Sequence, residues 1–492
     1  MNLRILRKLL LAPTVTACAL LFGACAAAQS NSSNSAVNPY VGSIQAVPAT
    51  PGVRSLSLDD AIRLGIQNNL ALRLAKDQQQ ASEAQKLQLV NVLLPNLSLH
   101  GETGVHEYNL EALGFHPSAI ALFAPLLPKG VPLSAFHLVT KVDTTIGQIN
   151  FSQALFNWGG YDVWRAAVAG QKAAFYYAQS ARGLVVLNVG TAYLQAVAAR
   201  SQVRYAQSLL NTDRTLLDQT HQEHLAGVVP NLDELRARVQ YQQQQQALIA
   251  AQDTFAKAKI ALNRAIGLAP EQQIRLTDTE PYAALEPLPI EQARAQAYRD
   301  RQDYQMLQQE LLVATLERRA TTHERFPTLT FNGNYGVTGI TGGVYHDTFA
   351  AVGTLSVPIF EEGKLRGDRD VAEAQLQEIR SRMADLTAKI DQQLRDSMLD
   401  LQTAEATVSV ARSNVQLAST ALDQTQQRFL AGVTDNLPVA EAESTLAAAQ
   451  TQYVNSVYQL NVARLGLARN LGIIDTQYKS FLSGEKPVPA PQ

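Results

Sequence analysis

Cysteine is absent from the body of this chain. Its two cysteines, Cys18 and Cys25, lie in the first 28 residues, so the rest of the sequence cannot form a disulfide framework.

An excess of positive charge is absent too. The formal net charge is −2 at pH 7, which provides no concentrated basic face, and we expect no nucleic-acid partner.

Long hydrophobic runs are also missing after the N-terminal segment. A membrane-spanning helix needs about 18 or more apolar residues in a row. The nearest later candidate, residues 184–199, is interrupted by Asn188, Thr191 and Gln195. If this chain crosses a membrane it must do so with strands, because only helices and closed barrels satisfy the backbone in lipid.

Residues 1–28 have the pattern of a signal peptide. Positive residues at Arg4, Arg7 and Lys8 precede a short apolar run, and small residues follow it. We therefore expect export. Two interpretations of Cys25 stand side by side: it becomes a lipidated first residue, or cleavage occurs nearby, for example after Ala28.

The two halves of the chain repeat the same landmarks in the same order, which indicates an internal duplication. Each half begins with a helical segment that ends before a proline, at Pro95 and at Pro327. The later landmarks begin at Leu155, Leu217, Leu225 and Asn231 in the first half and at Ile359, Leu422, Leu430 and Asn436 in the second.

The duplication predicts the division of the chain into parts. After the signal peptide (1–28) we expect an extended linker (29–56), a first repeat (57–269), a connector (270–289), a second repeat (290–474) and a disordered tail (475–492).

Alternation with period two begins directly after both prolines. Apolar residues such as Leu97, Leu99, Leu329 and Phe331 alternate with polar ones, and a partner segment in each half does the same. About ten residues with one apolar and one polar face are typical of a membrane-barrel strand. A strand of a soluble sandwich shows the same alternation.

Four such strands do not close a barrel, and open sheet edges are not tolerated in lipid. Two copies would give eight strands with a filled interior, whereas three would give twelve strands and leave a lumen. A water-filled channel therefore favours a homotrimer or a larger assembly in contact with membrane lipid. The long apolar connection at residues 107–141 either folds over the barrel mouth as a lid or packs on itself without such a role.

Proline is absent from two long stretches, residues 159–227 and 363–432. Each predicts a nearly continuous helix of about 65–70 residues, on the order of 100 Å long. A second helix returns from each glycine turn, at Gly227 and at Gly432, so the sequence predicts two long hairpins. Apolar residues in steps of three and four indicate narrow seams of the coiled-coil kind.

Taken together, the leader, the duplicated helix–strand–strand–long-helix unit and the paired glycine tips resemble the TolC-like outer-membrane efflux family over residues 57–474. The resemblance implies a mainly α fold with a membrane β-barrel, in which a trimeric twelve-stranded barrel continues as a twelve-helix periplasmic α-barrel. It also implies location in the outer membrane with a large periplasmic portion. The implied partners are a periplasmic adaptor (membrane fusion) protein and an inner-membrane pump that supplies the energy, so no cofactor is expected.

In the family, acidic residues after the second tip narrow and charge the tunnel entrance. The resemblance assigns the tip turns and entrance to Gly227, Asp233, Glu234, Gly432, Asp435 and Glu441. Pro438 stands where the family has an acidic residue. The alternative is that these acids only favour a helix N-terminus, by about 0.3–1 kcal/mol each.

Catalytic chemistry is not visible in the sequence, and we expect no enzyme activity and no catalytic, cofactor or metal site. His221 and His224 are three residues apart near the first tip but have no convincing third ligand, so a solvated helix face is the preferred interpretation. The expected function is an outer-membrane channel subunit of a tripartite efflux or type I secretion system. The alternatives are a periplasmic coiled-coil adaptor and a structural protein.

Overall fold

The computed structural model describes residues 42–43, 48–109, 112, 139–278, 288–434 and 436–483. The predicted signal peptide, Cys25, Asp435 and most of the long 107–141 connection lie outside the described residues. The chain divides into two compact units, and three of the long helices contribute to both of them. One unit combines the segments up to Ala71, Leu184–Glu280 and Leu417–Val454, and the other combines Leu72–Gly183, Pro281–Gln416 and the segment from Asn455 onward.

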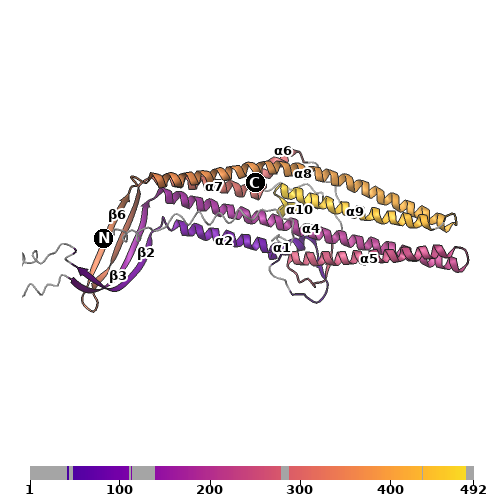
Figure 1. Cartoon of the computed structure of the whole chain (residues 1–492), viewed down its shortest axis with the longest axis horizontal. Coiled ribbons are helices and arrows are strands. Elements are labelled where there is room, and N and C mark those ends of the chain that lie inside the picture. Colours follow the sequence, from indigo (N-terminus) through magenta and orange to yellow (C-terminus); the bar gives the residue numbers. More distant parts are fainter. Residues whose placement is uncertain are drawn as a thin grey trace, which may run out of the picture. The chain divides into compact units, whose positions relative to one another are not determined.

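Two helical hairpins account for most of the described chain (Figure 1). Their longer arms are α4 (Trp158–Leu225, 68 residues) and α8 (Glu362–Leu430, 69 residues), and their returning arms are α5 (Asn231–Ile266) and α9 (Leu437–Asn470). The prediction of two long uninterrupted helices is confirmed. The apolar seam of α8 is also confirmed, because Leu376, Ile390 and Leu394 are buried.

The helix before each strand pair is broken, which corrects the prediction of one continuous helix up to each proline. The first half has α1 (Leu58–Asn68) and α2 (Leu70–Val90), and the second half has α6 (Ile290–Asp300) and α7 (Gln302–His323). The residues at the breaks, Asn69 and Arg301, have extended backbone and are buried.

Side-chain bonds hold both breaks. Asn69 Oδ1 accepts the Ala71 N–H at 2.9 Å, and Arg301 binds Asp303 at 2.6 Å. At the second break Asp303 Oδ1 also accepts the Tyr304 N–H at 3.0 Å. In both breaks a side chain thus satisfies a backbone N–H after the break, so neither break needs the proline or glycine that would have revealed it in the sequence.

Four antiparallel strands form one sheet in the order β2-β3-β5-β6. The strands are β2 (Asn96–Asn109), β3 (Val139–Phe156), β5 (Thr328–Ile340) and β6 (Tyr345–Ser356). They gather beside the start of α4 in Figure 1. The strands are longer than the predicted ten residues, and the pairing of β3 with β5 joins the two repeats.

The register separates an apolar from a polar face, as the alternation predicts. One row across the four strands consists of Leu99, Ile149, Tyr335 and Phe349, and all four are exposed in the single chain. The next row on the opposite face contains His100 and Gln148. The sheet therefore presents a continuous apolar stripe of large side chains.

Two further elements lie where the sequence predicts irregular chain. The short strands β1 (Arg54–Leu56) and β4 (Ile274–Leu276) pair in parallel, although both fall in segments expected to be linkers. The predicted disordered tail begins with α10 (Ile474–Ser483), in which Phe481 and Leu482 are buried. Burial of these apolar side chains stabilises a segment whose proline-rich end suggested disorder.

Candidate functional site

Both hairpins turn through a glycine with left-handed backbone. Gly227 has φ of +74° and Gly432 has φ of +69°. The residue after each glycine donates its N–H back to the helix, at 2.9 Å from Val228 to Glu223 and at 3.0 Å from Val433 to Arg428. This hydrogen bond is typical of a helix C-terminus capped by a left-handed glycine. Both glycines therefore end a long helix and begin the turn, where the sequence predicts them.

The first tip contains a charged cluster centred on Glu234. This side chain is buried in the first turn of α5, where its Oε1 lies 2.7 Å from Arg238 Nη2 and 3.1 Å from His221 Nδ1. His224 Nε2 lies 3.9 Å from the other carboxylate oxygen. The two histidines singled out in the sequence thus face a carboxylate across the turn rather than solvent alone.

Asp233 is buried beside this cluster and connects the two hairpins. Its backbone carbonyl accepts a buried hydrogen bond of 2.7 Å from Asn436 Nδ2, which belongs to the second tip. Its side chain lies 3.4 Å from Arg236. The sequence shows Asn436 only as a repeat landmark, and its hydrogen bond across the tips was not predicted because it depends on the packing of two segments far apart in the chain.

The second tip is less charged. Phe429 and Val439 are buried there, while Glu441 lies on the exposed face of α9. The structure therefore brings Asp233 and Glu234 into a paired, buried arrangement and leaves Glu441 exposed. The position of Asp435 is outside the described residues.

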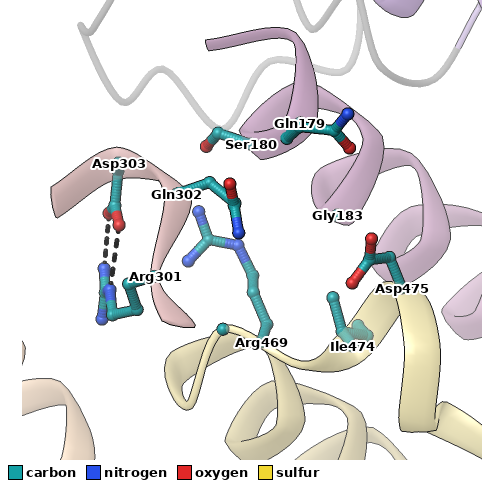
Figure 2. Close-up of a pocket in the computed structure, with 10 residues that line it drawn as sticks. Gln179, Ser180, Gly183, Arg301, Gln302, Asp303, Arg469, Ile474 and Asp475 are labelled. Carbon is teal, nitrogen blue, oxygen red and sulfur yellow. Dashed lines mark hydrogen bonds and ion pairs between the residues drawn. The ribbon is translucent and has the colours of Figure 1, made fainter. Parts of the chain in front are cut away.

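A small pocket lies in the other unit, at the break between α6 and α7 (Figure 2). It is lined by the break residues Arg301, Gln302 and Asp303, by the end of α9, by the start of α10 and by one turn of α4. Burial acts to raise the pKa of Asp303, but the hydrogen bond and charge of Arg301 outweigh it and lower that pKa. The pocket is a structural junction with paired charges.

Within the described residues, no cluster of three or more histidine, cysteine, aspartate or glutamate side chains has a geometry suited to a metal ion. No described helix combines the length and apolar character needed to cross a membrane.

Comparison with known proteins gives a family match over most of the chain. A family model described as "Outer membrane efflux protein" matches residues 61–268 and 293–473. One curated relative is the pyoverdine export outer membrane protein OpmQ of Pseudomonas aeruginosa, which is 26% identical over 341 residues, or 67% of this chain and 70% of that protein. Another is the outer membrane protein TolC of Escherichia coli, 22% identical over 355 residues, or 68% of this chain and 71% of that protein.

Solved structures share the fold. The Campylobacter jejuni CmeC outer membrane channel superposes with a TM-score of 0.67 at 16% identity, covering 85% of this chain and 86% of that one. The outer membrane protein VceC of Vibrio cholerae superposes with a TM-score of 0.68 at 18% identity, covering 84% and 96%. The duplicated helix–strand–strand–long-helix arrangement is therefore shared with channels of known structure.

Proposed function

This chain belongs to the outer membrane efflux protein family, and from that premise we propose that three copies form one passive channel, which a periplasmic adaptor and an inner-membrane pump supply. The family consists of outer-membrane channels of efflux and secretion systems. The chain is accordingly an outer-membrane channel subunit with a large periplasmic helical portion. The trimer, the adaptor, the pump and the absence of a catalytic step are the proposed parts.

The observation that supports assembly is the four-stranded sheet with its apolar stripe. Within the described residues, β2 pairs only with β3 and β6 pairs only with β5, so each keeps one unpaired edge. In lipid, an unpaired strand edge leaves backbone groups without hydrogen bonds at a cost of several kcal/mol each. Pairing β2 of one copy with β6 of the next removes these edges, and three copies give a twelve-stranded barrel with a lumen.

Edge pairing is tested with single cysteines placed along β2 and along β6 in the full chain. The described body has no native cysteine, so every disulfide reports an introduced pair. We expect outer-membrane fractions to contain disulfide-linked chains for β2–β6 pairs in register and a trimer at saturation. A monomer in the soluble fraction with full helicity would overturn the assembly.

The tips are the proposed entrance, because both glycine turns and the acidic residues Asp233 and Glu234 lie there. Val228 and Val433 are exposed in the turns and suit cysteine substitution. We expect oxidation to join neighbouring hairpins, to leave the trimer in the outer membrane, and to stop transport until a reductant is added. Each single-cysteine variant is the control. Unimpaired transport through linked trimers would show that the tips are not the gate.

A further inference from the structure

Two buried carboxyl groups meet between the hairpins, in the unit that carries the tips. Asp213 on α4 and Glu443 on α9 are each 2% exposed, and their side chains lie within reach of each other. Among the residues that the structure describes, no other donor reaches any of the four carboxyl oxygens. Two carboxylates cannot hydrogen-bond to each other, so a hydrogen bond within the pair requires a proton on one of them.

The pair occupies core positions of the seam. On α4, Asp213 falls between the buried Leu209 and Leu216, and on α9, Glu443 falls between the buried Val439 and Leu446. The spacing of three and four residues is that of an apolar helix–helix seam. Carboxyl groups here are costly unless a proton and a partner satisfy them.

The duplication does not repeat this pair. At the corresponding places, counted from the shared Leu-Asp-Gln-Thr landmark, Ala418 stands for Asp213 and Arg238 stands for Glu443. Ala418 is buried and apolar, and Arg238 is exposed and bound to Glu234. The carboxyl pair is therefore a feature of the α4–α9 contact alone.

Other charges on the four helices near the tips are satisfied elsewhere. On α5, Arg236 and Arg238 pair with Asp233 and Glu234, which also meets the two α4 histidines. Glu223 on α4 is half-buried and accepts a hydrogen bond from Gln219. The other charged side chains near the tips are exposed: Arg214 and Asp218 on α4, Asp423 and Arg428 on α8, and Glu441 on α9. Burial is the largest cause of the raised pKa of both members of the pair, and the other member is the side chain that further alters each pKa.

We propose that Asp213 and Glu443 share one proton and act as a proton-dependent clasp that holds α4 of the first hairpin to α9 of the second. Glu443 O–H donates to the Asp213 carboxylate. Loss of that proton leaves two carboxylates in contact in a buried seam, which drives the helices apart. A role of the clasp in holding a channel entrance closed rests on the proposed function. The proton-dependent contact between α4 and α9 does not.

The direction of the pH effect follows from proton linkage. Burial, together with the hydrogen bond and charge of Asp213, raises the pKa of Glu443 from 4.5 to about 9, and burial also raises the pKa of Asp213. In a separated, solvated state both pKa values return to their ordinary range. The clasped state then holds the extra proton between about pH 4.5 and 9. The clasp is strongest at the acidic end and is lost as pH rises through about 9.

The proton is tested by infrared difference spectroscopy of the purified full-length channel, comparing the natural chain with Glu443→Gln. We expect a C=O stretching band of a protonated carboxylic acid at pH 7 that is missing in Glu443→Gln and disappears from the natural chain above about pH 9. Asp218→Asn, an exposed carboxyl on α4, is the matched control and keeps the band. Absence of the band at pH 7 would overturn the shared proton.

The clasp is tested by the distance between spin labels on cysteines at Arg214 and Ser444, which are exposed beside the pair. Labelled chains are assembled with an excess of unlabelled ones so that only distances within one chain are read. The ratio of separated to clasped molecules should rise with pH, by up to about tenfold per pH unit.

Glu443→Gln should lose this dependence and remain clasped, because its amide N–H replaces the shared proton. A distance that ignores pH in the natural chain, or the same pH response in Glu443→Gln, would overturn the clasp. Neither measurement uses transport, so failure of the proposed channel route and failure of the clasp are separate results.

Discussion

The two hairpin tips share one backbone turn but stabilise it with different chemistry. Before the glycine stands His224 in the first tip and Phe429 at the corresponding place in the second. After the glycine, Glu234 corresponds to Val439. The first tip thus buries a carboxylate among basic partners, whereas the second buries apolar side chains.

This difference shows which part of a duplicated unit is constrained. The left-handed turn favours glycine in both copies, because other residues adopt positive φ only at a cost. The positions around it must be buried and satisfied, but either paired charges or apolar packing meets that need. In each tip the buried side chains therefore match one another. Exchanging a single residue between the tips should lower the free energy of unfolding more than exchanging a matched pair.

The largest effect is expected when charge is placed alone in the second tip. Val439 is 0% exposed, and Val439→Asp would bury a carboxylate without the histidine and arginine partners of the first tip. We expect a loss of about 3–5 kcal/mol of unfolding free energy, the range for an uncompensated buried charge. Thermal unfolding of the purified channel measures it, with Val439→Ala as the size control. If Val439→Asp and Val439→Ala unfolded at the same temperature, the second tip would tolerate a buried carboxylate, and the proposed difference between the two tips would be wrong.

The helix breaks extend the comparison to the other ends of the hairpins. Arg301→Ala removes the partner of Asp303 and leaves that carboxylate largely buried, so we expect a loss of about 3 kcal/mol. Asn69→Ala removes the neutral hydrogen bond to the Ala71 N–H, and loss of that bond should cost about 1 kcal/mol. Denaturant unfolding at neutral pH gives both values.

The pH dependence separates the two breaks further. The folded pKa of Asp303 is lowered, so its contribution to stability is present above the unfolded pKa of 3.8 and is lost as pH falls through the lower folded value. In Arg301→Ala this loss of unfolding free energy at acidic pH should be absent, whereas Asn69→Ala should show it as the natural chain does. Identical acid profiles for both variants would contradict the assignment to the ion pair.

Alanine substitutions at four of the glycines with positive φ should rank how crowded the surroundings of each glycine are. A Cβ at Gly472 would lie 2.5 Å from the Arg301 backbone nitrogen, and one at Gly267 would lie 2.6 Å from the Asn68 side chain. Backbone cannot yield as a side chain does, so Gly472→Ala should cost about 2–3 kcal/mol and Gly267→Ala somewhat less.

The tip glycines complete this ranking. A Cβ at Gly227 or Gly432 would meet nothing within 4 Å. Alanine at either position should lower the free energy of unfolding only by the cost of holding alanine in left-handed backbone, about 1–2 kcal/mol. Thermal unfolding of the four variants gives the order, and equal values for Gly472→Ala and Gly432→Ala would contradict it.

Periodicity accounts for much of what the sequence predicts correctly. Proline-free stretches identified α4 and α8, and period-two alternation identified the strands and the apolar face. The breaks at Asn69 and Arg301 were not predicted, because side-chain hydrogen bonds cause them without proline or glycine. The pairing of β1 with β4 was missed because three residues carry too little pattern. The Asn436–Asp233 and Asp213–Glu443 contacts join segments more than 200 residues apart, which no local pattern reveals.

The smallest net effect is expected when the chemistry of one tip is moved whole to the other. His224→Phe alone should leave Glu234 with one partner fewer, and Glu234→Val alone should leave two histidines and Arg238 without their carboxylate. Each single change should cost about 1–2 kcal/mol, because the basic side chains are partly exposed and regain water. The double variant reproduces the apolar combination of Phe429 and Val439, and replacing a buried ion pair by apolar residues is often neutral. We therefore expect the double variant to lose less than about 1 kcal/mol, which is less than the sum of the two single losses in the double-mutant cycle. Strictly additive losses would mean that the two positions do not act together and that the tips are not interchangeable.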